Sequence, residues 1–486
     1  MYKTAEGITL FVIVWVKKMK YYTLKSNYAL RGWSNKKYAL LDLECTKIKG
    51  KVMELTKLQF DALELITSGG VSAEEKIFPD SIRKMADWAA EKGYLEECGR
   101  DKQLFDYQKY HYTEARYTHT LLWSITGNCN LKCRHCYISS GKNCYGELTE
   151  DQCDEVIRQC LEANVNMVAL TGGEPLVRKD FWNIVDRLRE NHIKILQVFT
   201  NGMLVDETFM DEFDRRIIDP NYFMLSFDGV DRHDWLRGVK GAEKRTIEAI
   251  RLIKSRGYRV TVSMSLHMGN IDSLMDTYEL MKQLGTDHWK AVPIVDTGNW
   301  KNQNQQDIDI NKIYEEYLRL IKAYIDDNMP MRLGLGGFFQ GYNDEKRCEI
   351  PFISGCGNCG RCSQTLCEPI MIFPYLLPDG RVLPCIAMSG SELENIAPNI
   401  FDEGESLEKA LSNSVVDTYT RYTYRDLYEH NSECAACGHK YICSGCRANA
   451  LANGGYFEKD PLACSFIKGG YERKIKEIAS KGIQWN

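Results

Sequence analysis

CNLKCRHCY, residues 129–137, places three cysteines at C-x3-C-x2-C spacing. Three thiolates at this spacing can hold three irons of a [4Fe–4S] cube and leave the fourth iron without a protein ligand. An open iron can bind a small chelating molecule, which favours chemistry over electron storage alone. The alternative is a zinc site completed by His135, although ordinary zinc sites pair their ligands at other spacings.

Three further motifs follow this segment in order, namely Thr171-Gly172-Gly173-Glu174-Pro175, Ser226-Phe227-Asp228-Gly229 and His233-Asp234-Trp235-Leu236-Arg237-Gly238. With Cys129, Cys133 and Cys136, this ordered set resembles the radical S-adenosylmethionine (SAM) enzymes. The resemblance implies that the three cysteines hold a [4Fe–4S] cluster and that SAM binds its open iron. Reduction of bound SAM then gives a 5′-deoxyadenosyl radical that abstracts a substrate hydrogen.

The resemblance also assigns residues to SAM. The Gly172-Gly173-Glu174 motif is expected to hold the methionyl amine, and Ser226 and Arg237 the ribose and carboxylate side. His135 either packs on the adenine or is an ordinary loop residue.

Asp228 has an alternative interpretation as a turn residue that closes its strand. Gly229 would then supply the permissive dihedral angles.

Alternating strand and helix patterns surround these motifs. Strands are predicted at 121–125, 167–170, 193–199, 222–227, 259–266 and 289–294, with helices at 181–190, 207–213, 243–256 and 274–284. Such alternation predicts a parallel sheet, and six units are too few for an eightfold barrel. We expect an α/β fold with a partial (β/α)6 barrel over residues 120–330 and functional groups at its carboxyl strand ends. A further helix, opened by a Thr149–Gln152 capping box, would bury Cys153 and Cys160 in the core.

Residues 19–103 are expected to form a winged-helix-like module, and residues 104–119 a linker. The module would contain strands at 21–30 and 38–43, a helix opened by a Thr56–Gln59 capping box with Leu58 on its apolar face, and a helix at 79–92. It resembles the leader-peptide recognition domain of peptide-modifying radical enzymes, which would bind a leader segment by strand addition. A DNA-binding winged helix and a packing domain are the alternatives, and acidic residues such as Glu74 and Glu75 disfavour DNA.

Cysteines crowd again in residues 345–486, where the pattern resembles the SPASM extension with its two auxiliary [4Fe–4S] clusters. Three clusters are therefore expected in all. The resemblance gives the distal cluster four ligands: Cys434, Cys437, Cys443 and Cys464. It gives the proximal cluster Cys367, Cys385 and Cys446, with Cys362 as a candidate for the fourth position.

Two features depart from the SPASM pattern. Cys443 and Cys446 are separated by two residues where the family has three, and Gly445 can absorb the shorter loop. Cys348, Cys356 and Cys359 exceed the pattern. Three interpretations of residues 355–362 are open. They supply the fourth ligand of the proximal cluster, they hold another metal, or they contact the substrate.

Charge and hydropathy narrow the class of protein. A net charge of −5 and a pI near 6.1 argue against a broadly basic nucleic-acid surface. The apolar run at 8–16 is shorter than the ~20 residues of a membrane span, so we expect residues 1–18 to be peripheral, with Met19 as a plausible alternative start. Clustered C-x2-C pairs without a recognisable signal peptide favour metal-binding cysteines in a reducing cytoplasm over disulfides.

The combined resemblance implies a maturase of a ribosomally made precursor peptide, served by an external reductant such as flavodoxin or ferredoxin. We expect it to form Cys-to-Cα thioether (sactionine) crosslinks. Carbon–carbon crosslinking, epimerisation and an anaerobic sulfatase-maturing activity are the enzymatic alternatives. A non-enzymatic iron–sulfur carrier or sensor is the alternative from another class.

Overall fold

The chain folds into two compact units, the first holding mainly residues up to His111 and the second Tyr112–Asn486. The boundary lies within the stretch predicted as a linker, which itself contains η1 (Asp106–Gln108) and β6 (His111–Thr113). The computed structural model describes residues 19–43, 52–69, 72, 79–116, 118, 120–139, 145–216, 222–302, 308–355, 357–367, 373–412, 414–479 and 484–485. The expectations for residues 1–18, Glu74, Glu75 and Cys356 lie outside these ranges.

The first unit packs two helices against short antiparallel strands. Its strands are β1 (Tyr21–Leu24), β2 (Tyr28–Trp33), β3 (Lys37–Asp42), β4 (Val52–Leu55) and β5 (Leu95–Cys98), and its helices are α1 (Lys57–Thr67) and α2 (Asp80–Glu91). β1 pairs with β5, and β3 lies between β4 and β2. Leu30, Leu40, Phe60 and Leu63 are among its core residues.

Three details test the predictions for this unit. The single strand predicted at 21–30 is wrong, because a turn in which Tyr28 N donates to Lys25 O (3.0 Å) divides it into β1 and β2. The capping box is confirmed, with Thr56 N donating to Gln59 Oε1 at 2.9 Å and Gln59 N to Thr56 Oγ1 at 3.3 Å. The placing of Leu58 on the buried face is also wrong, because 66% of its surface is exposed.

The second unit is built on the six predicted parallel strands. In the described part of the chain they are β7 (Thr120–Ser124), β8 (Met167–Thr171), β9 (Lys194–Thr200), β10 (Tyr222–Ser226), β11 (Val260–Leu266) and β12 (His288–Pro293). Each is paired in parallel with the next in sequence order. The sheet is therefore singly wound, which confirms the α/β expectation.

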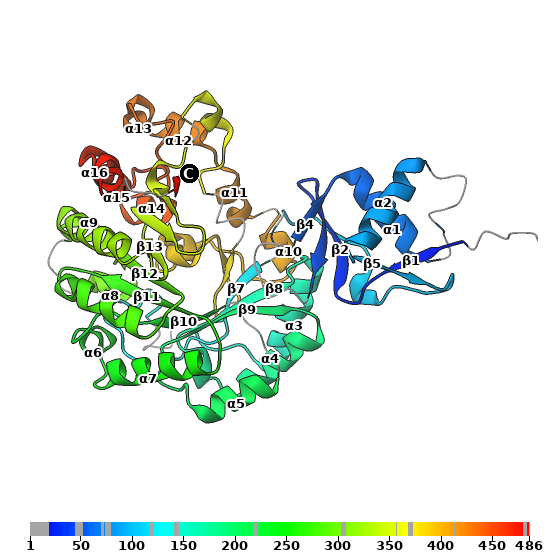
Figure 1. Cartoon of the computed structure of the whole chain (residues 1–486), viewed down its shortest axis with the longest axis horizontal. Coiled ribbons are helices and arrows are strands. Elements are labelled where there is room, and N and C mark those ends of the chain that lie inside the picture. The colour runs from blue at the N-terminus through cyan, green and yellow to red at the C-terminus, as the bar shows by residue number, and fades with distance from the viewer. Residues whose placement is uncertain are drawn as a thin grey trace, which may run out of the picture. The chain divides into compact units, whose positions relative to one another are not determined.

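Helices cover the outer face of this sheet (Figure 1). They are α3 (Glu150–Glu162), α4 (Phe181–Glu190), α5 (Glu207–Arg215), α6 (His233–Arg237), α7 (Ala242–Ser255), α8 (Leu274–Gln283) and α9 (Ile310–Asp326). Cys153 and Cys160 are fully buried on α3, as predicted, and the Thr149–Gln152 capping box is present. Trp289 of β12 stacks on Tyr278 of α8 with ring centroids 6.1 Å apart, so alternate strand residues face the helices.

Short strands extend the sheet on both sides beyond the six predicted ones. After β12 come β13 (Arg332–Leu335), β14 (Phe339–Tyr342), β15 (Arg347–Glu349) and β18 (Gln484–Trp485), and before β7 come β16 (Tyr375–Leu376) and β17 (Val382–Leu383). Because β16 pairs with β7, the cysteine-rich region is joined to the barrel sheet. Its helices are α10 (Leu407–Ala410), α11 (Val415–Arg421), α12 (Tyr424–His430), α13 (Ser432–Ala436), α14 (Arg447–Ala452), α15 (Pro461–Lys468) and α16 (Tyr471–Ile478).

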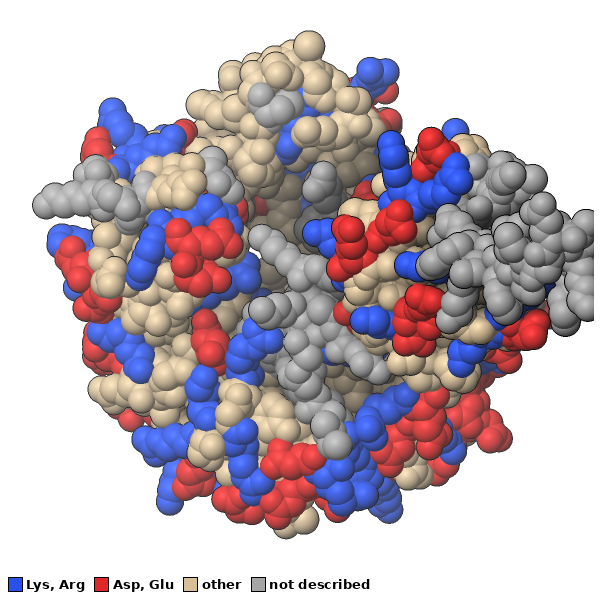
Figure 2. Space-filling model, turned by 45° about the vertical axis from the view of Figure 1, so that its right-hand side comes forward, with Lys and Arg blue, Asp and Glu red and all other residues tan. Residues whose placement is uncertain are grey.

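Figure 2 shows Lys and Arg interspersed with Asp and Glu over the coloured part of the face in view. Within the described ranges, no helix combines the length and apolar character needed to cross a lipid bilayer.

Candidate active site

The first two sequence motifs meet at the carboxyl ends of β7 and β8. Gly173 N donates to Thr126 O and Glu174 N to Asn128 O, both at 2.8 Å. A Cβ atom on Gly173 would lie 2.2 Å from Asn128 O, far inside van der Waals contact. Only glycine therefore lets this motif lie directly against the loop at 126–139, which we call the cluster loop because it carries Cys129, Cys133 and Cys136.

The other flank of the cluster loop is held by the segment that contains Arg237. Lys132 N donates to Arg237 O (3.2 Å) and Arg134 N to Leu236 O (2.9 Å). Gly238 adopts a φ of +72°, and a Cβ there would lie 2.7 Å from Lys132 O. The segment and the cluster loop are thus joined by main-chain contacts that side chains would disrupt.

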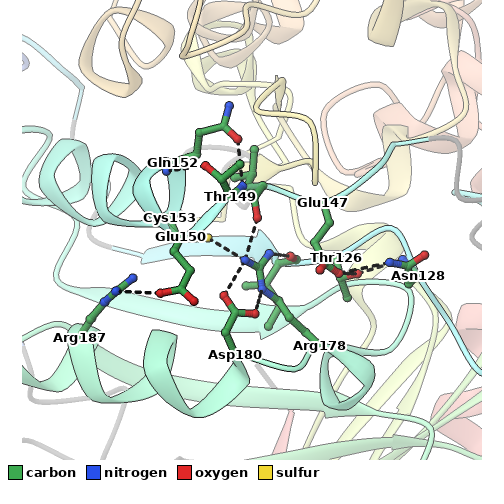
Figure 3. Close-up of polar contacts among 12 residues, drawn as sticks. Thr126, Asn128, Glu147, Thr149, Glu150, Gln152, Cys153, Arg178, Asp180 and Arg187 are labelled. Atoms are coloured by element: carbon green, nitrogen blue, oxygen red, sulfur yellow. Dashed lines mark hydrogen bonds and ion pairs between the residues drawn. The ribbon is translucent and has the colours of Figure 1, made fainter.

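A polar frame supports the start of the cluster loop (Figure 3). Glu147 accepts hydrogen bonds from Thr126 Oγ1 and from Asn128 Nδ2, the latter at 3.2 Å. Arg178, only 4% exposed, donates to Ile125 O (2.6 Å) and pairs with Asp180 (2.8 Å). Sequence reasoning missed Arg178, although its place three residues after Pro175 of the glycine motif is a usable signal.

Glu174 is buried, and its carboxylate is held by the loop after β9. Its Oε1 accepts from Thr200 Oγ1 (2.8 Å) and its Oε2 from Asn201 N (2.7 Å). Burial raises the pKa of Glu174 to about 7, while these hydrogen bonds oppose the shift. Asn201 also donates through Nδ2 to Asn130 Oδ1 (2.7 Å), which connects Glu174 to the cluster loop. Thr200 and Asn201 were not predicted, although polar residues at the end of a parallel strand are a recognisable signal.

Arg237 lies beside a cluster cysteine and is paired with Asp228. Its Nε is 2.6 Å from Asp228 Oδ2, and its Nη1 contacts Cys133 Sγ at 3.6 Å. Asp228 is completely buried and also accepts from Ser265 N (2.9 Å) through Oδ1. The interpretation of Asp228 as a turn residue agrees with the φ of +108° at Gly229, and the Asp228 side chain in addition positions Arg237.

The remaining two predicted cofactor residues lie close to this pair. The Nδ1 atom of His135 is buried without a hydrogen-bond partner among the described residues, and burial lowers the pKa of His135 to about 3. Its ring is thus neutral and has a ring nitrogen free for a ligand. Ser226 ends β10, is half-buried and pairs in register with Ser263 of β11.

The three cluster-loop cysteines are near enough to interact electrostatically, and their chemistry suits a metal cluster. Burial, with smaller contributions from the charges of Cys133, Glu174 and Cys136, raises the pKa of Cys129 to about 12. Three thiolates that repel one another in a buried site need a compensating cation, which a [4Fe–4S] cluster supplies. Among the described residues, no three His, Cys, Asp or Glu side chains lie close enough to share one metal ion.

The four predicted distal ligands are brought together in the cysteine-rich region. Cys434, Cys437, Cys443 and Cys464 all line one cavity of about 410 Å³. Asp460 borders the same cavity, and a Cβ atom on Gly445 would lie 2.9 Å from Asp460 Cβ. The short Cys443–Cys446 spacer therefore follows a path that has little room for a side chain at Gly445.

For the predicted proximal ligands, the structure shows an interaction between two cysteines. Cys385 and Cys446 interact electrostatically, and burial raises the pKa of Cys385 to about 11. Cys362 follows on η7 (Cys359–Ser363) and lies near Tyr428, a residue of the distal cavity that also interacts with Cys443. Of the unassigned cysteines, Cys348 is fully buried in β15 and Cys359 is exposed.

Comparisons with known proteins agree with this geometry. Residues 123–281 match the Radical SAM superfamily. The chain is 24% identical over 361 residues to the AdoMet-dependent heme synthase of Methanosarcina barkeri, covering 72% of this chain and 97% of that protein. It is 25% identical to the antilisterial bacteriocin subtilosin biosynthesis protein AlbA of Bacillus subtilis, covering 71% of this chain and 70% of AlbA.

Solved structures show the same fold. SuiB of Streptococcus suis, in its crystal structure bound to the precursor peptide SuiA, superposes with a TM-score of 0.60 at 14% identity. The superposition covers 91% of this chain and 99% of that chain. Residues 123–281 thus carry the Radical SAM match, and the chain is an enzyme, which argues against the non-enzymatic carrier or sensor.

Proposed function

We propose that the chain is a peptide maturase that forms Cys-to-Cα thioether crosslinks in a ribosomally made precursor peptide. The observation that carries the proposal is the extent of the likeness to SuiB. It covers 91% of the chain, more than residues 112–486 alone can supply, so the first unit takes part in it. The matched architecture, including part of that unit, occurs in SuiB, which has been crystallised with its precursor peptide SuiA.

The first unit offers the features that leader binding requires. In the described part of the chain, β4 lies at the end of the strand order β4-β3-β2, where an extended peptide can add by main-chain hydrogen bonds. A groove of about 330 Å³ between α1 and α2 is lined by Leu58, Ala62, Met85 and Trp88. Such apolar pockets give sequence preference to a strand-adding ligand. Leu58, which is 66% exposed, would then contact the bound peptide.

The second unit would hold the cofactors of the reaction. Cys129, Cys133 and Cys136 would bind the [4Fe–4S] cluster, and Glu174, Ser226, Arg237 and His135 would contact SAM. When bound, these groups supply the one-electron chemistry that removes a hydrogen atom from a substrate C–H bond. The residues themselves orient SAM and exclude water.

Two auxiliary clusters complete the proposal, with the distal one held in the cavity of Cys434, Cys437, Cys443 and Cys464. The proximal one would use Cys367, Cys385 and Cys446. The position of Cys362 near Tyr428 of the distal cavity favours a proximal set of three cysteines, which would leave one iron for a substrate thiol. A substrate sulfur held there supports C–S over C–C bond formation, in a cytoplasm that supplies flavodoxin or ferredoxin as reductant.

Mass spectrometry of a cysteine-containing precursor after anaerobic turnover tests this function. We expect a loss of two hydrogens per crosslink together with the loss of one alkylatable thiol that no reductant restores. The same mass loss with intact thiols would contradict thioether formation and indicate carbon–carbon crosslinking. Deuterium uptake from heavy water without mass loss would indicate an epimerase.

Leader dependence is tested with the same full-length enzyme. A precursor without its leader should lose most of its turnover, and Leu58→Lys in the groove should weaken turnover only of the leader-bearing peptide. Undiminished turnover of the leaderless peptide would contradict leader binding and favour a sulfatase-maturing type of activity.

Heme synthesis is a second candidate, because the match to the Methanosarcina barkeri heme synthase covers 97% of that protein. This function requires no peptide. Heme synthesis would be established if the enzyme formed heme from an iron-containing tetrapyrrole precursor and SAM, as monitored by the absorbance of heme. No heme formation under conditions that support peptide modification would remove it.

A further inference from the structure

A row of inward-facing residues crosses β10 to β13 inside the barrel. Ser226 pairs in register with Ser263, Ser263 with Lys290, and Lys290 with Gly334. Register partners on neighbouring parallel strands point to the same face. Trp289, which directly precedes Lys290 on β12, packs on the helices outside the sheet. Because neighbouring strand residues point to opposite faces, the row that contains Lys290 faces the barrel lumen.

The row is open to a ligand. Val292 of β12 has the same orientation as Lys290, lies one step nearer the carboxyl strand ends and is 38% exposed. Ser226, Ser263 and Lys290 are half-buried. Because Ser226 is also a candidate SAM contact, Lys290 lies at the level where a substrate would face the cofactor.

Lys290 has no partner within the described ranges. It makes no hydrogen bond or ion pair with any described residue, and Arg332 on β13 is the charge that acts on it. His288, two residues earlier, is kept neutral because burial lowers its pKa to about 2, with Lys290 and Arg332 adding to the shift. Arg332 stacks on the ring of Tyr342, whose hydroxyl donates to Glu349 (2.9 Å), whereas Lys290 has no carboxylate partner among the described residues.

Gly334 is the register neighbour of Lys290 on β13, so residue 334 places no side chain against the lysine. A Cβ atom there would already be in van der Waals contact with Lys290 Cγ (3.5 Å) and His288 Nε2 (3.4 Å). Glycine therefore leaves this flank of the lysine stem uncrowded.

We propose that Lys290, with Arg332 behind it, binds a carboxylate of the substrate in the barrel lumen. A cation in a water-poor site is stabilised by an anion that arrives with the ligand. The inference rests on the proposed peptide-maturase function. It specifies that the precursor carries an Asp, a Glu or its C-terminal carboxylate beside the modified position.

A first experiment tests carboxylate binding without any precursor peptide. The intact holoenzyme is acetylated with N-hydroxysulfosuccinimide acetate, and the rate at Lys290 is followed by peptide mass spectrometry. N-acetylglutamate amide should slow acetylation of Lys290 by about fourfold at three-quarters occupancy, because only the free fraction reacts. N-acetylglutamine amide, its neutral isostere, should have no effect. Equal rates with the two compounds would overturn the proposal.

Lys244 on α7 serves as the internal control. Its side chain is 81% exposed on the outside of the barrel, so neither compound should change its rate. Equal slowing of Lys244 and Lys290 would mean consumption of the reagent and would also count against the site.

A second experiment uses the precursor peptide with each Asp or Glu changed to Asn or Gln. One such change should raise KM by about 30-fold with the wild-type enzyme, as expected for loss of a buried charge partner. With Lys290→Met the same peptide change should have less than about a twofold effect, because the partner is already absent. Equal effects in both enzymes would overturn the inference. If the wild-type enzyme modifies no peptide, the proposed function fails, while the acetylation result still decides carboxylate binding.

Iron content and the thermal unfolding midpoint show whether Lys290→Met folds normally. Lys290→Arg provides a second variant that keeps the charge, and it should retain the sensitivity to the peptide carboxylate. Loss of that sensitivity in Lys290→Arg, with normal iron content, would contradict binding by charge.

Discussion

Arg237 joins the buried carboxylate of Asp228 to a cysteine of the cluster loop. Its Nε lies 2.6 Å from Asp228 Oδ2, and its Nη1 lies 3.6 Å from Cys133 Sγ. Burial disfavours ionised Asp228, yet the Arg237 charge holds the pKa of Asp228 below its usual value. A guanidinium so placed would stabilise a thiolate at Cys133, and it depends on Asp228 to stay in position.

Asp228→Asn should therefore lower both stability and cluster binding. Removing one partner of a buried ion pair leaves the other uncompensated, at a cost of about 3–5 kcal/mol. We expect a lower unfolding midpoint and less iron per chain, measured by thermal denaturation and iron assay.

A surface ion pair provides the matched control. Lys322 and Asp326 on α9 are paired, but their side chains are 67% and 62% exposed. Asp326→Asn should change stability by less than about 1 kcal/mol, because exposed pairs contribute little. Equal effects of the two substitutions would show that Asp228 has no special role.

Gly173→Ala should prevent normal assembly of the cluster site. Its Cβ would lie 2.2 Å from Asn128 O, which is a main-chain atom that cannot rotate away. Overpacking of this kind usually costs about 1–3 kcal/mol, and here the strain falls on the cluster loop itself. Iron content and the visible absorbance of the reconstituted enzyme measure the effect. Gly99→Ala, where a Cβ would meet no atom within 4 Å, should keep full iron content.

The distal cavity predicts which cysteine substitutions remove iron. Cys443→Ser should lower the iron content by about four atoms per chain, the content of one [4Fe–4S] cluster. Cys348→Ala should keep all the iron and lower only stability, because Cys348 is a fully buried residue of β15. Retention of iron in Cys443→Ser, or its loss in Cys348→Ala, would contradict the assignment.

The fold around the site could be predicted because its signals are local. The six parallel strands were found from short apolar runs, and α4 was predicted with its observed bounds at 181–190. The two capping boxes were found because they depend on residues only three apart. The strands from β13 onward were missed because they have two to four residues and depend on neighbours distant in sequence.

The site was predictable only where a motif has fixed spacing. Two motifs contact the cluster loop directly, Asp228 of the third reaches it through Arg237, and the four distal cysteines share a cavity. The ion pair of Asp228 with Arg237 was not predicted, because the sequence does not show whether a turn Asp is also buried. Lys290 was missed because its partnerless state depends on register between strands, which no local pattern reveals.

The pH dependence of acetylation at Lys290 should show the effect of burial and of its charged neighbour on the pKa of Lys290. Burial, and then the charge of Arg332, lowers the pKa of Lys290 to about 8, against about 10.4 for an ordinary lysine. The facing residues are His288 on the same strand, Ser263 on β11 and Gly334 on β13, so Arg332 is the charged neighbour. Because only the neutral amine is acetylated, the rate at Lys290 should rise through about pH 8.

The carboxylate probe should show the opposite trend. The ammonium form exists below about pH 8, so protection by N-acetylglutamate amide should be strong there and lost above it. Arg332→Met removes the neighbouring cation and should move both transitions to higher pH, but not as far as 10.4, because burial remains the larger cause. Arg319→Met on the exposed face of α9, where the arginine side chain is 69% exposed, should leave both transitions unchanged. A transition of Lys290 that stays in place in Arg332→Met would show that the charge of Arg332 does not act on Lys290.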